Sequence, residues 1–331
     1  MAFFSRIPDK VLRSARSILY SLRAEKLIYR THRPGDVIVM YHNVLPLLKR
    51  DLNMRNVSVA DFTQTLSYLK KNFCVIPLRE MLTTESDLRR IAITFDDGLV
   101  NNLNYALPVL EALKMHATFF VSTPWINGSA SLWPDQLSRV LQEVKGDILF
   151  GNRKFSRVVH NHFKCMESGE RLEMALLNVN HSVVETFIAQ LISDHGIDLE
   201  NDRAPEEEWR VMKGEEIKIL AASKFVEIGG HTVSHRNLLH LNDQQLNAEI
   251  VENKHYLEQI CKKDIDMFAF PFGCYSQRIV NACYDVGYEH LVAVTEADER
   301  IVSKNEISFR LGLYNDTSVV DQLHLINKSF A

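Results

Sequence analysis

Residues Ile91-Ala-Ile-Thr-Phe-Asp-Asp-Gly98 form an apolar run that ends in two adjacent carboxylates and a glycine. The run is typical of a buried strand, and neighbouring residues of an extended segment point to opposite sides. Asp96 and Asp97 can therefore take different tasks in one pocket: one holds a cation while the other stays free as a base. The same two aspartates can also simply cap a helix after the strand, because Asp favours N-cap positions.

A second polar stretch, Gly229-Gly-His-Thr-Val-Ser-His235, follows another short apolar run. It supplies two imidazoles four residues apart. Taken alone, such histidines are more often ordinary turn residues than metal ligands. Together, the two histidines and the two aspartates supply the groups of a hydrolytic metal site. Such a site needs two imidazole ligands, one carboxylate ligand and a second carboxylate that stays free of the metal.

The composition is that of an ordinary soluble globular protein: 331 residues, 46% hydrophobic and 24% charged. A formal net charge of −4 argues against general nucleic-acid binding. The five cysteines are odd in number and form no Cys-x-x-Cys motif, which is typical of free thiols in a reducing compartment. No apolar stretch is long enough to span a bilayer, and arginines interrupt the place of a secretory signal. We therefore expect a cytoplasmic protein.

Residues 1–35 differ in charge from the rest of the chain. They hold eight Lys or Arg residues against Asp9 and Glu25, a net of +6. A helix is predicted over residues 8–30, with apolar residues roughly on one side and basic residues on the other. Two interpretations stay open: a solvated helix packed on the body of the protein, or an amphipathic segment in peripheral contact with the anionic inner membrane surface.

Residues 36–331 alternate between short β-rich runs and helical patterns such as 59–71 and 102–113. This alternation favours parallel βαβ units, and about seven strands fit a distorted (β/α) barrel better than an open sheet. The alternation of strands and helices stops over a segment of about 124–214, which is predicted to be a mostly helical insertion over one barrel face. The predicted strands are 37–42, 73–77, 91–95, 117–122, 225–228, 267–270 and 291–294.

In barrels of this type, catalytic side chains lie at the C-terminal ends of the strands. Asp96, Asp97, His231 and Phe272 all fall just past such ends, although they come from three separate segments. We therefore expect one site at one end of the barrel.

The chain resembles the polysaccharide deacetylase family (carbohydrate esterase family 4), whose shared unit is the NodB homology domain. The likeness covers roughly residues 36–312, without most of the insertion, and includes a first strand similar to that of the exopolysaccharide-type branch. Its motifs occur here in the family's order: Val39-Met-Tyr-His42, Thr94-Phe-Asp-Asp-Gly98, Ala117-Thr-Phe-Phe-Val121, His231-Thr-Val-Ser-His235 and Phe268-Ala-Phe-Pro-Phe-Gly273.

The resemblance implies a hydrolase that removes an N-acetyl group from an amino sugar in a polysaccharide or a lipid-linked glycan precursor. It implies a divalent metal, zinc first and cobalt, manganese or nickel as alternatives. The ligands would be Asp97, His231 and His235, with Asp96 as the general base. The backbone N–H of Phe272 would bind the oxyanion, and Pro271 and Gly273 in the same turn would contact the substrate.

The sequence departs from the family in two places. The third motif lacks the arginine that usually lies beside the catalytic aspartate, and Arg310 can substitute from another strand. The late histidine that serves as general acid is also not fixed, with His324, His290 and His42 as candidates. Trp133 either stacks on a sugar ring or packs in the core.

Other classes of function can be weighed against this one. A metalloprotease would need His-Glu-x-x-His, but Thr232 follows His231. An iron oxygenase also uses two histidines and a carboxylate, yet it needs no second adjacent aspartate. The alternatives that remain are a deformylase or another amide hydrolase on the same fold, and a catalytically inactive barrel that binds glycan.

Overall fold

The computed structural model describes residues 33–47, 55–159, 161–201, 205–294, 307–314 and 318–330. The basic segment at residues 1–32, with its predicted helix over 8–30, lies outside the described residues. No helix in the described ranges is both long and apolar enough to cross a membrane.

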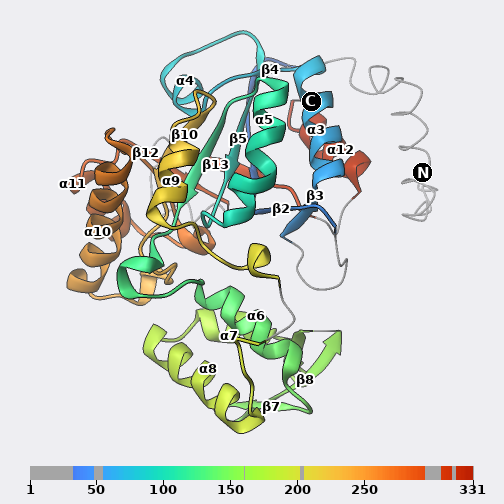
Figure 1. Cartoon of the computed structure of the whole chain (residues 1–331), viewed down its shortest axis with the longest axis vertical. Coiled ribbons are helices and arrows are strands. Elements are labelled where there is room, and N and C mark those ends of the chain that lie inside the picture. The colour runs from blue at the N-terminus through green and yellow to red at the C-terminus, as the bar shows by residue number, and fades with distance from the viewer. Residues whose placement is uncertain are drawn as a thin grey trace, which may run out of the picture.

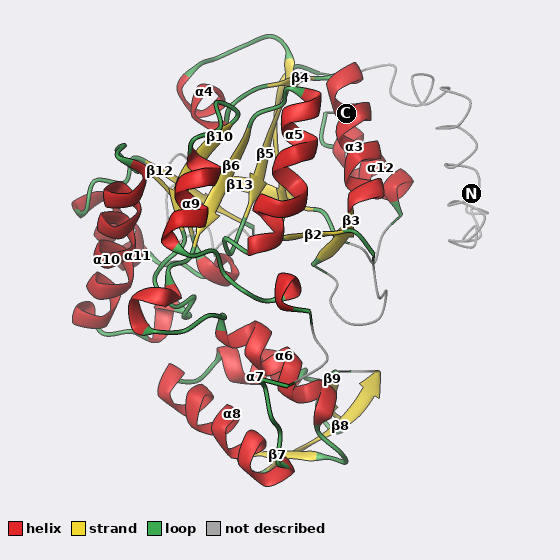
Figure 2. Ribbon diagram, viewed as in Figure 1, coloured by secondary structure: helices red, strands yellow, loops and turns green. Residues whose placement is uncertain are grey.

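Seven parallel strands close into a ring within the described part of the chain (Figures 1 and 2). The pairing of β1 with β5 closes it, and runs in register from Gly35 opposite Arg89 to Tyr41 opposite Phe95. This ring confirms the predicted distorted (β/α) barrel. Its strands, in order, are β1 (Gly35–Tyr41), β13 (Ile307–Gly312), β12 (His290–Ala293), β11 (Met267–Ala269), β10 (Val226–Gly230), β6 (Ala117–Val121) and β5 (Arg89–Phe95).

Two strands differ from the prediction. The run at 73–77 forms only the two-residue strand β4 (Cys74–Val75). This strand pairs with the start of β5 and lies outside the ring, because the ring strand β6 pairs with the end of β5. The ring is completed instead by β13, which is absent from the predicted strands. Its sequence places Ser308 and the buried Arg310 between apolar residues, so no apolar run marks it.

Alternate residues of the strands pack into different cores. Val37 and Val39 of β1 belong to the large cluster between the strands and the surrounding helices. Ile38, between them, belongs to a second cluster with Ala92, Phe120 and other strand residues. Because both sides of the strands are buried, the strands have the near-continuous apolar sequences from which they are predicted.

Helices surround the ring. A capping box begins α10 (Asp243–Cys261), since the Asn242 side chain accepts from Gln245 N at 2.9 Å and the Gln245 side chain accepts from Asn242 N at 3.1 Å. The predicted helix at 102–113 begins with a π-helical turn, η1 (Asn102–Ala106), and continues as α5 (Leu107–Leu113). The other helices here are α3 (Val59–Asn72), α4 (Leu78–Thr83), α9 (Gly214–Ala221), α10 (Asp243–Cys261), α11 (Gln277–Asp285) and α12 (Val319–Lys328).

The insertion forms a separate lobe with its own core, seen below the barrel in Figure 1. Its helices are α6 (Trp133–Glu143), α7 (Leu172–Leu177) and α8 (His181–His195). It also contains an antiparallel sheet that the sequence does not predict, made of β7 (Ile148–Phe150), β8 (Arg153–Val159) and β9 (His162–Cys165).

Short elements complete the described chain. The parallel pair β2 (Asn43–Leu45) and β3 (Asn56–Ser58) joins the loop after β1 to the start of α3. Four single turns are η2 (Pro124–Asn127), η3 (Glu206–Glu208), η4 (Leu238–His240) and η5 (Pro271–Gly273).

Candidate active site

The turn after β5 directs Asp96 and Asp97 to different partners. Asp97 and Gly98 both have left-handed backbone, with φ of 73° and 74°. A Cβ atom at Gly98 would lie only 2.7 Å from Cγ1 of Val121 on the neighbouring β6. Glycine is therefore required here, because it allows both the positive φ and the close approach of the two strands.

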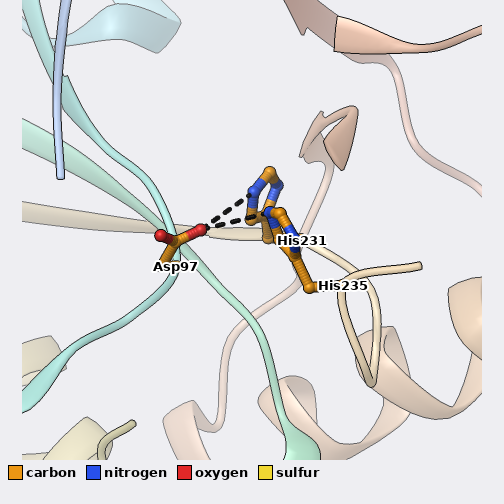
Figure 3. A group of neighbouring side chains, drawn as sticks. All are labelled: Asp97, His231 and His235. Atoms are coloured by element: carbon orange, nitrogen blue, oxygen red, sulfur yellow. Dashed lines mark ion pairs between the residues drawn. The ribbon is translucent and has the colours of Figure 1, made fainter. Parts of the chain in front are cut away.

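Asp97, His231 and His235 come together at the end of β5 and β10 (Figure 3). The Asp97 Oδ1 atom lies 3.2 Å from Nε2 of His235 and 3.6 Å from Nε2 of His231. Ligand atoms at roughly 2.0–2.1 Å from a tetrahedral zinc ion lie about 3.3 Å from one another. The spacing of these donor atoms therefore fits a divalent metal, and the buried Oδ1 has no hydrogen-bond donor among the described residues.

The second ring nitrogen of His231 faces the backbone. Its Nδ1 lies 2.7 Å from the carbonyl oxygen of Ala269, at the end of β11. Donation from Nδ1–H to this carbonyl leaves the Nε2 lone pair directed at Asp97. Such an outer contact orients a histidine ligand and sets its tautomer.

The protonation states also suit metal binding. Burial raises the pKa of Asp97, but the adjacent His235 and His231 rings outweigh this and hold the pKa well below its usual range. Burial lowers the pKa of His235, and the nearby Asp97 carboxylate offsets this only in part. An ionised carboxylate beside a neutral imidazole is the state in which both groups bind a cation.

Asp96 has a different partner, Arg310 of β13. The two guanidinium nitrogens donate to its two carboxylate oxygens at 2.6 and 2.7 Å. Burial raises the pKa of Asp96, but the charge and hydrogen bonds of Arg310, together with the nearby His231 and His42 rings, outweigh burial, so the pKa is below its ordinary value. The structure thus places Arg310 where the missing arginine of the third motif would act, and keeps Asp96 ionised.

Asn253 of α10 joins the strand ends that carry the histidines. Its side-chain amide donates to the carbonyl oxygens of Val121 and Thr232 at 3.0 and 2.8 Å, and its oxygen accepts from His231 N at 3.2 Å. The residue is fully buried. It lies in the middle of an amphipathic helix, where no local motif distinguishes it from a core polar residue.

The turn of the third motif lies beside the histidines. Phe272 has a positive φ of 59°, and its ring packs against His235 with centroids 4.5 Å apart. Phe272 and Gly273 line the cleft, whereas Pro271 is buried and is not among the lining residues, so the expected contact of Pro271 with the substrate is not seen.

The three candidate general acids lie in different places. His42 follows β1 and lines the cleft, and burial lowers its pKa to about 4. His290 is the first residue of β12, at the opposite end of the barrel from Asp96. His324 lies on α12, which packs against α3 outside the ring. Of the three, the structure brings only His42 into the site.

A cleft of about 490 Å³ lies between the end of the barrel and the insertion. Trp133 is not part of its lining; the ring is only 8% exposed and packs against Phe272 at 5.6 Å. A sugar therefore has no open face of Trp133 on which to stack. The barrel contributes His42, Arg55, Asp96, His231, His235, Phe270 and Tyr314, and the insertion contributes Leu137, Leu141, Asn161, His162, Arg171, Glu173 and Met174.

Comparisons with known proteins identify the family of the chain. The family model described as polysaccharide deacetylase matches residues 84–152 and 187–291, together more than half of the chain. No curated protein matches the chain by sequence.

Solved structures share the fold. The deacetylase PplD of Streptococcus pyogenes, in complex with acetate, has a TM-score of 0.57 at 16% identity, covering 89% of this chain and 99% of that one. The polysaccharide deacetylase BC0361 of Bacillus cereus has a TM-score of 0.54 at 18% identity, covering 89% and 69%. IcaB of Ammonifex degensii has a TM-score of 0.52 at 16% identity, covering 90% and 100%. Because the family model matches more than half of the chain, with both motif histidines inside the match, the chain belongs to the polysaccharide deacetylase family, whose members hydrolyse N-acetyl amide bonds.

Proposed function

We propose that this protein removes the N-acetyl group of an amino sugar, held in a polysaccharide or in a lipid-linked glycan precursor, with the help of a divalent metal. One observation carries the proposal. A cation-binding set, Asp97 with His231 and His235, lies beside a separate ionised carboxylate, Asp96, on one substrate-sized cleft.

Asp97, His231 and His235 would hold the metal, for which zinc is the first choice. When bound, such an ion polarises the amide carbonyl and makes a water more acidic. Asp96 accepts the proton of the attacking water, and Arg310 keeps its carboxylate ionised and oriented. The backbone N–H of Phe272 donates to the carbonyl oxygen as negative charge develops there.

The leaving amine also needs a proton, and we assign its delivery to His42. Burial lowers the pKa of this ring to about 4, so it is neutral at pH 7 and has to gain a proton, the one that leaves the attacking water, before it can give one to the amine. Replacing His42 with Gln should reduce kcat by roughly 100-fold or more. Activity within a few-fold of wild type would remove His42 from this role.

The test of the reaction is acetate release from N-acetylated oligosaccharides and lipid-linked glycans. Asp96→Asn should reduce kcat by roughly 100- to 10,000-fold, because the amide cannot accept the proton. The control is Asp36→Asn, which alters a carboxylate paired with Arg90 at the other end of β1. Equal activity in Asp96→Asn and wild type would refute the proposed base.

The same assay separates the alternatives. Release of formate from an N-formyl sugar, without acetate release, would favour the deformylase. Binding of glycan with no turnover, in a protein loaded with metal, would favour the inactive glycan-binding barrel.

We also propose a cytoplasmic enzyme that residues 1–35 hold at the inner membrane surface. The support is their net charge of +6. Deleting these residues should move the protein from the membrane fraction to the supernatant in cell fractionation. Unchanged membrane association after the deletion would contradict the role of this segment.

A further inference from the structure

The first turn of α6, in the insertion, contacts the metal-ligand set from outside the cleft. Trp133 donates from its indole Nε1 to the carbonyl oxygen of His235 at 2.9 Å. His235 has a positive φ of 55°, a conformation that a non-glycine residue adopts only when its surroundings hold it there. The insertion therefore supplies a hydrogen bond at the point where the backbone of this ligand is strained.

A second connection reaches Asp97 through Arg55. One guanidinium nitrogen of Arg55 donates to Asp97 Oδ2 at 2.8 Å, and the other donates to Asp135 Oδ1 at 2.5 Å. Asp97 and Asp135 are 0% and 3% exposed, so both carboxylates depend on this arginine for solvation. Arg55 thus links the third residue of α6 to a metal ligand.

The contact with Arg55 also defines which oxygen of Asp97 is available. Oδ2 is occupied by the guanidinium, while Oδ1 faces the two imidazoles and has no hydrogen-bond donor among the described residues. A planar guanidinium that bridges two fixed carboxylates allows little rotation of either. Asp97 is therefore oriented to offer one oxygen to a cation.

We propose that Arg55, Trp133 and Asp135 form a brace, through which the insertion positions Asp97 and His235 as metal ligands. The three are positioning residues, and the inference rests on the metal-dependent function proposed above. Docking of the insertion and assembly of the metal site are then coupled, since the brace has one end in each lobe. Outer contacts of this kind typically change metal affinity by about 10- to 100-fold.

The test uses two substitutions that leave the net charge unchanged. Arg55→Lys keeps the positive charge but replaces the planar two-pronged guanidinium with a single nitrogen on a shorter side chain. Trp133→Phe keeps an aromatic ring but lacks the indole donor. Each should weaken Zn²⁺ and Co²⁺ binding by about 10-fold or more, measured by competition with a chromophoric chelator. The visible absorption of the Co²⁺-loaded protein should also change, because it reports ligand geometry.

Matched controls exist on the same chain. Trp125 of η2 also donates its indole N–H to a backbone carbonyl, that of Val211 at 2.9 Å, which does not belong to a ligand residue. Arg90 holds the Asp36 carboxylate through two hydrogen bonds at the start of β1, away from any candidate ligand residue. Trp125→Phe and Arg90→Lys should lower stability without changing metal affinity or the Co²⁺ spectrum.

The outcomes separate the two proposals. If wild type binds metal tightly and both folded brace variants bind it equally well, with an unchanged Co²⁺ spectrum, the brace is refuted while the proposed function stands. If wild type binds neither Zn²⁺ nor Co²⁺, both fail. Should Arg55→Lys not fold by circular dichroism, Trp133→Phe decides the question, because it removes one donor and keeps the ring.

Discussion

Asp96 and Asp97 are adjacent in the chain, yet their carboxylates have different surroundings. Asp96 accepts two hydrogen bonds from Arg310, whereas Asp97 lies between Arg55 and the two histidines. Both pKa values are below the usual range for Asp, although burial acts in the opposite direction in both. The group that lowers the pKa most is Arg310 for Asp96 and His235 for Asp97, so the two carboxylates can be tested separately.

The Arg310→Lys substitution tests the partner of Asp96. Lysine keeps the charge but cannot form two parallel hydrogen bonds to one carboxylate. A hydrogen bond to a charged group contributes roughly 1.5–3 kcal/mol, so we expect kcat/KM to fall by about 10- to 100-fold. Arg90→Lys, at the arginine that holds Asp36 at the other end of the barrel, should leave kcat/KM unchanged.

The pH profile gives this substitution a second readout. The base must be ionised, and its depressed pKa keeps wild type active as pH falls through the ordinary range of Asp titration, near 3.9. Weakening the contact with Arg310 raises the pKa of Asp96, so the acid limb of kcat/KM should move to higher pH. An acid limb that stays in place would mean that Asp96 is not the titrating base.

At the residue scale, sequence indicates which side chains meet where they belong to a local motif. The family resemblance implies Asp97, His231 and His235 as a ligand set, and the structure brings possible ligand atoms of these residues within 4.8 Å of one another. Arg55 was missed because nothing in its local sequence marks it; its role comes entirely from what lies opposite it in space. The same holds for Asn253, which looks like any polar residue of a helix.

At the element scale, the turn after β5 is the tightest part of the site. Its backbone has positive φ at two consecutive residues, and Gly98 packs directly on β6. This strained turn points the two carboxylates in different directions. A change of backbone here should therefore affect both stability and metal binding.

Gly98→Ala tests that expectation. The added methyl group meets Val121 at 2.7 Å and stands on a residue with φ of 74°, so we expect a loss of about 3 kcal/mol in the free energy of unfolding, together with weaker metal binding. Gly128→Ala is the control, since its φ is 75° but no atom lies within 4 Å of the new Cβ. It should lose only about 1 kcal/mol in a urea titration and bind metal normally. Similar losses in both variants would show that packing against β6 is unimportant.

Elements were predictable where apolar residues run without interruption. The buried strands β1, β5, β6 and β12 have such runs on both faces, so their positions follow from sequence. β13 does not, because it carries the buried arginine of the site in its middle. The sheet of the insertion was missed for a related reason: β8 has only one buried residue, Phe155, among polar and exposed ones.

At the scale of the whole molecule, the metal set lies at the junction of the barrel and the insertion. All three proposed ligand residues are buried and come from strands far apart in the sequence, so an ion bound there would be bound by the folded state alone. Ligands of that kind stabilise a protein by mass action, by about 4 kcal/mol when present at 1,000 times Kd.

Metal removal should therefore lower the melting temperature. We expect calorimetry to give a lower Tm in EDTA than in Zn²⁺, and Asp97→Asn to lose most of this difference. The same Tm for wild type under both conditions would argue against a metal that is bound at this site.

The hydrogen bond between Arg310 and Asp96 joins residues 214 positions apart. A nascent chain therefore exposes the strand that carries the base long before its counter-charge is synthesised. Until β13 is synthesised, no strand lies between β1 and β12, so the ring stays open. The Asp96 carboxylate also lacks the Arg310 guanidinium during this time. The enzyme would therefore become active only near the end of translation. A chain stalled on the ribosome before residue 307 should be inactive and prone to aggregation.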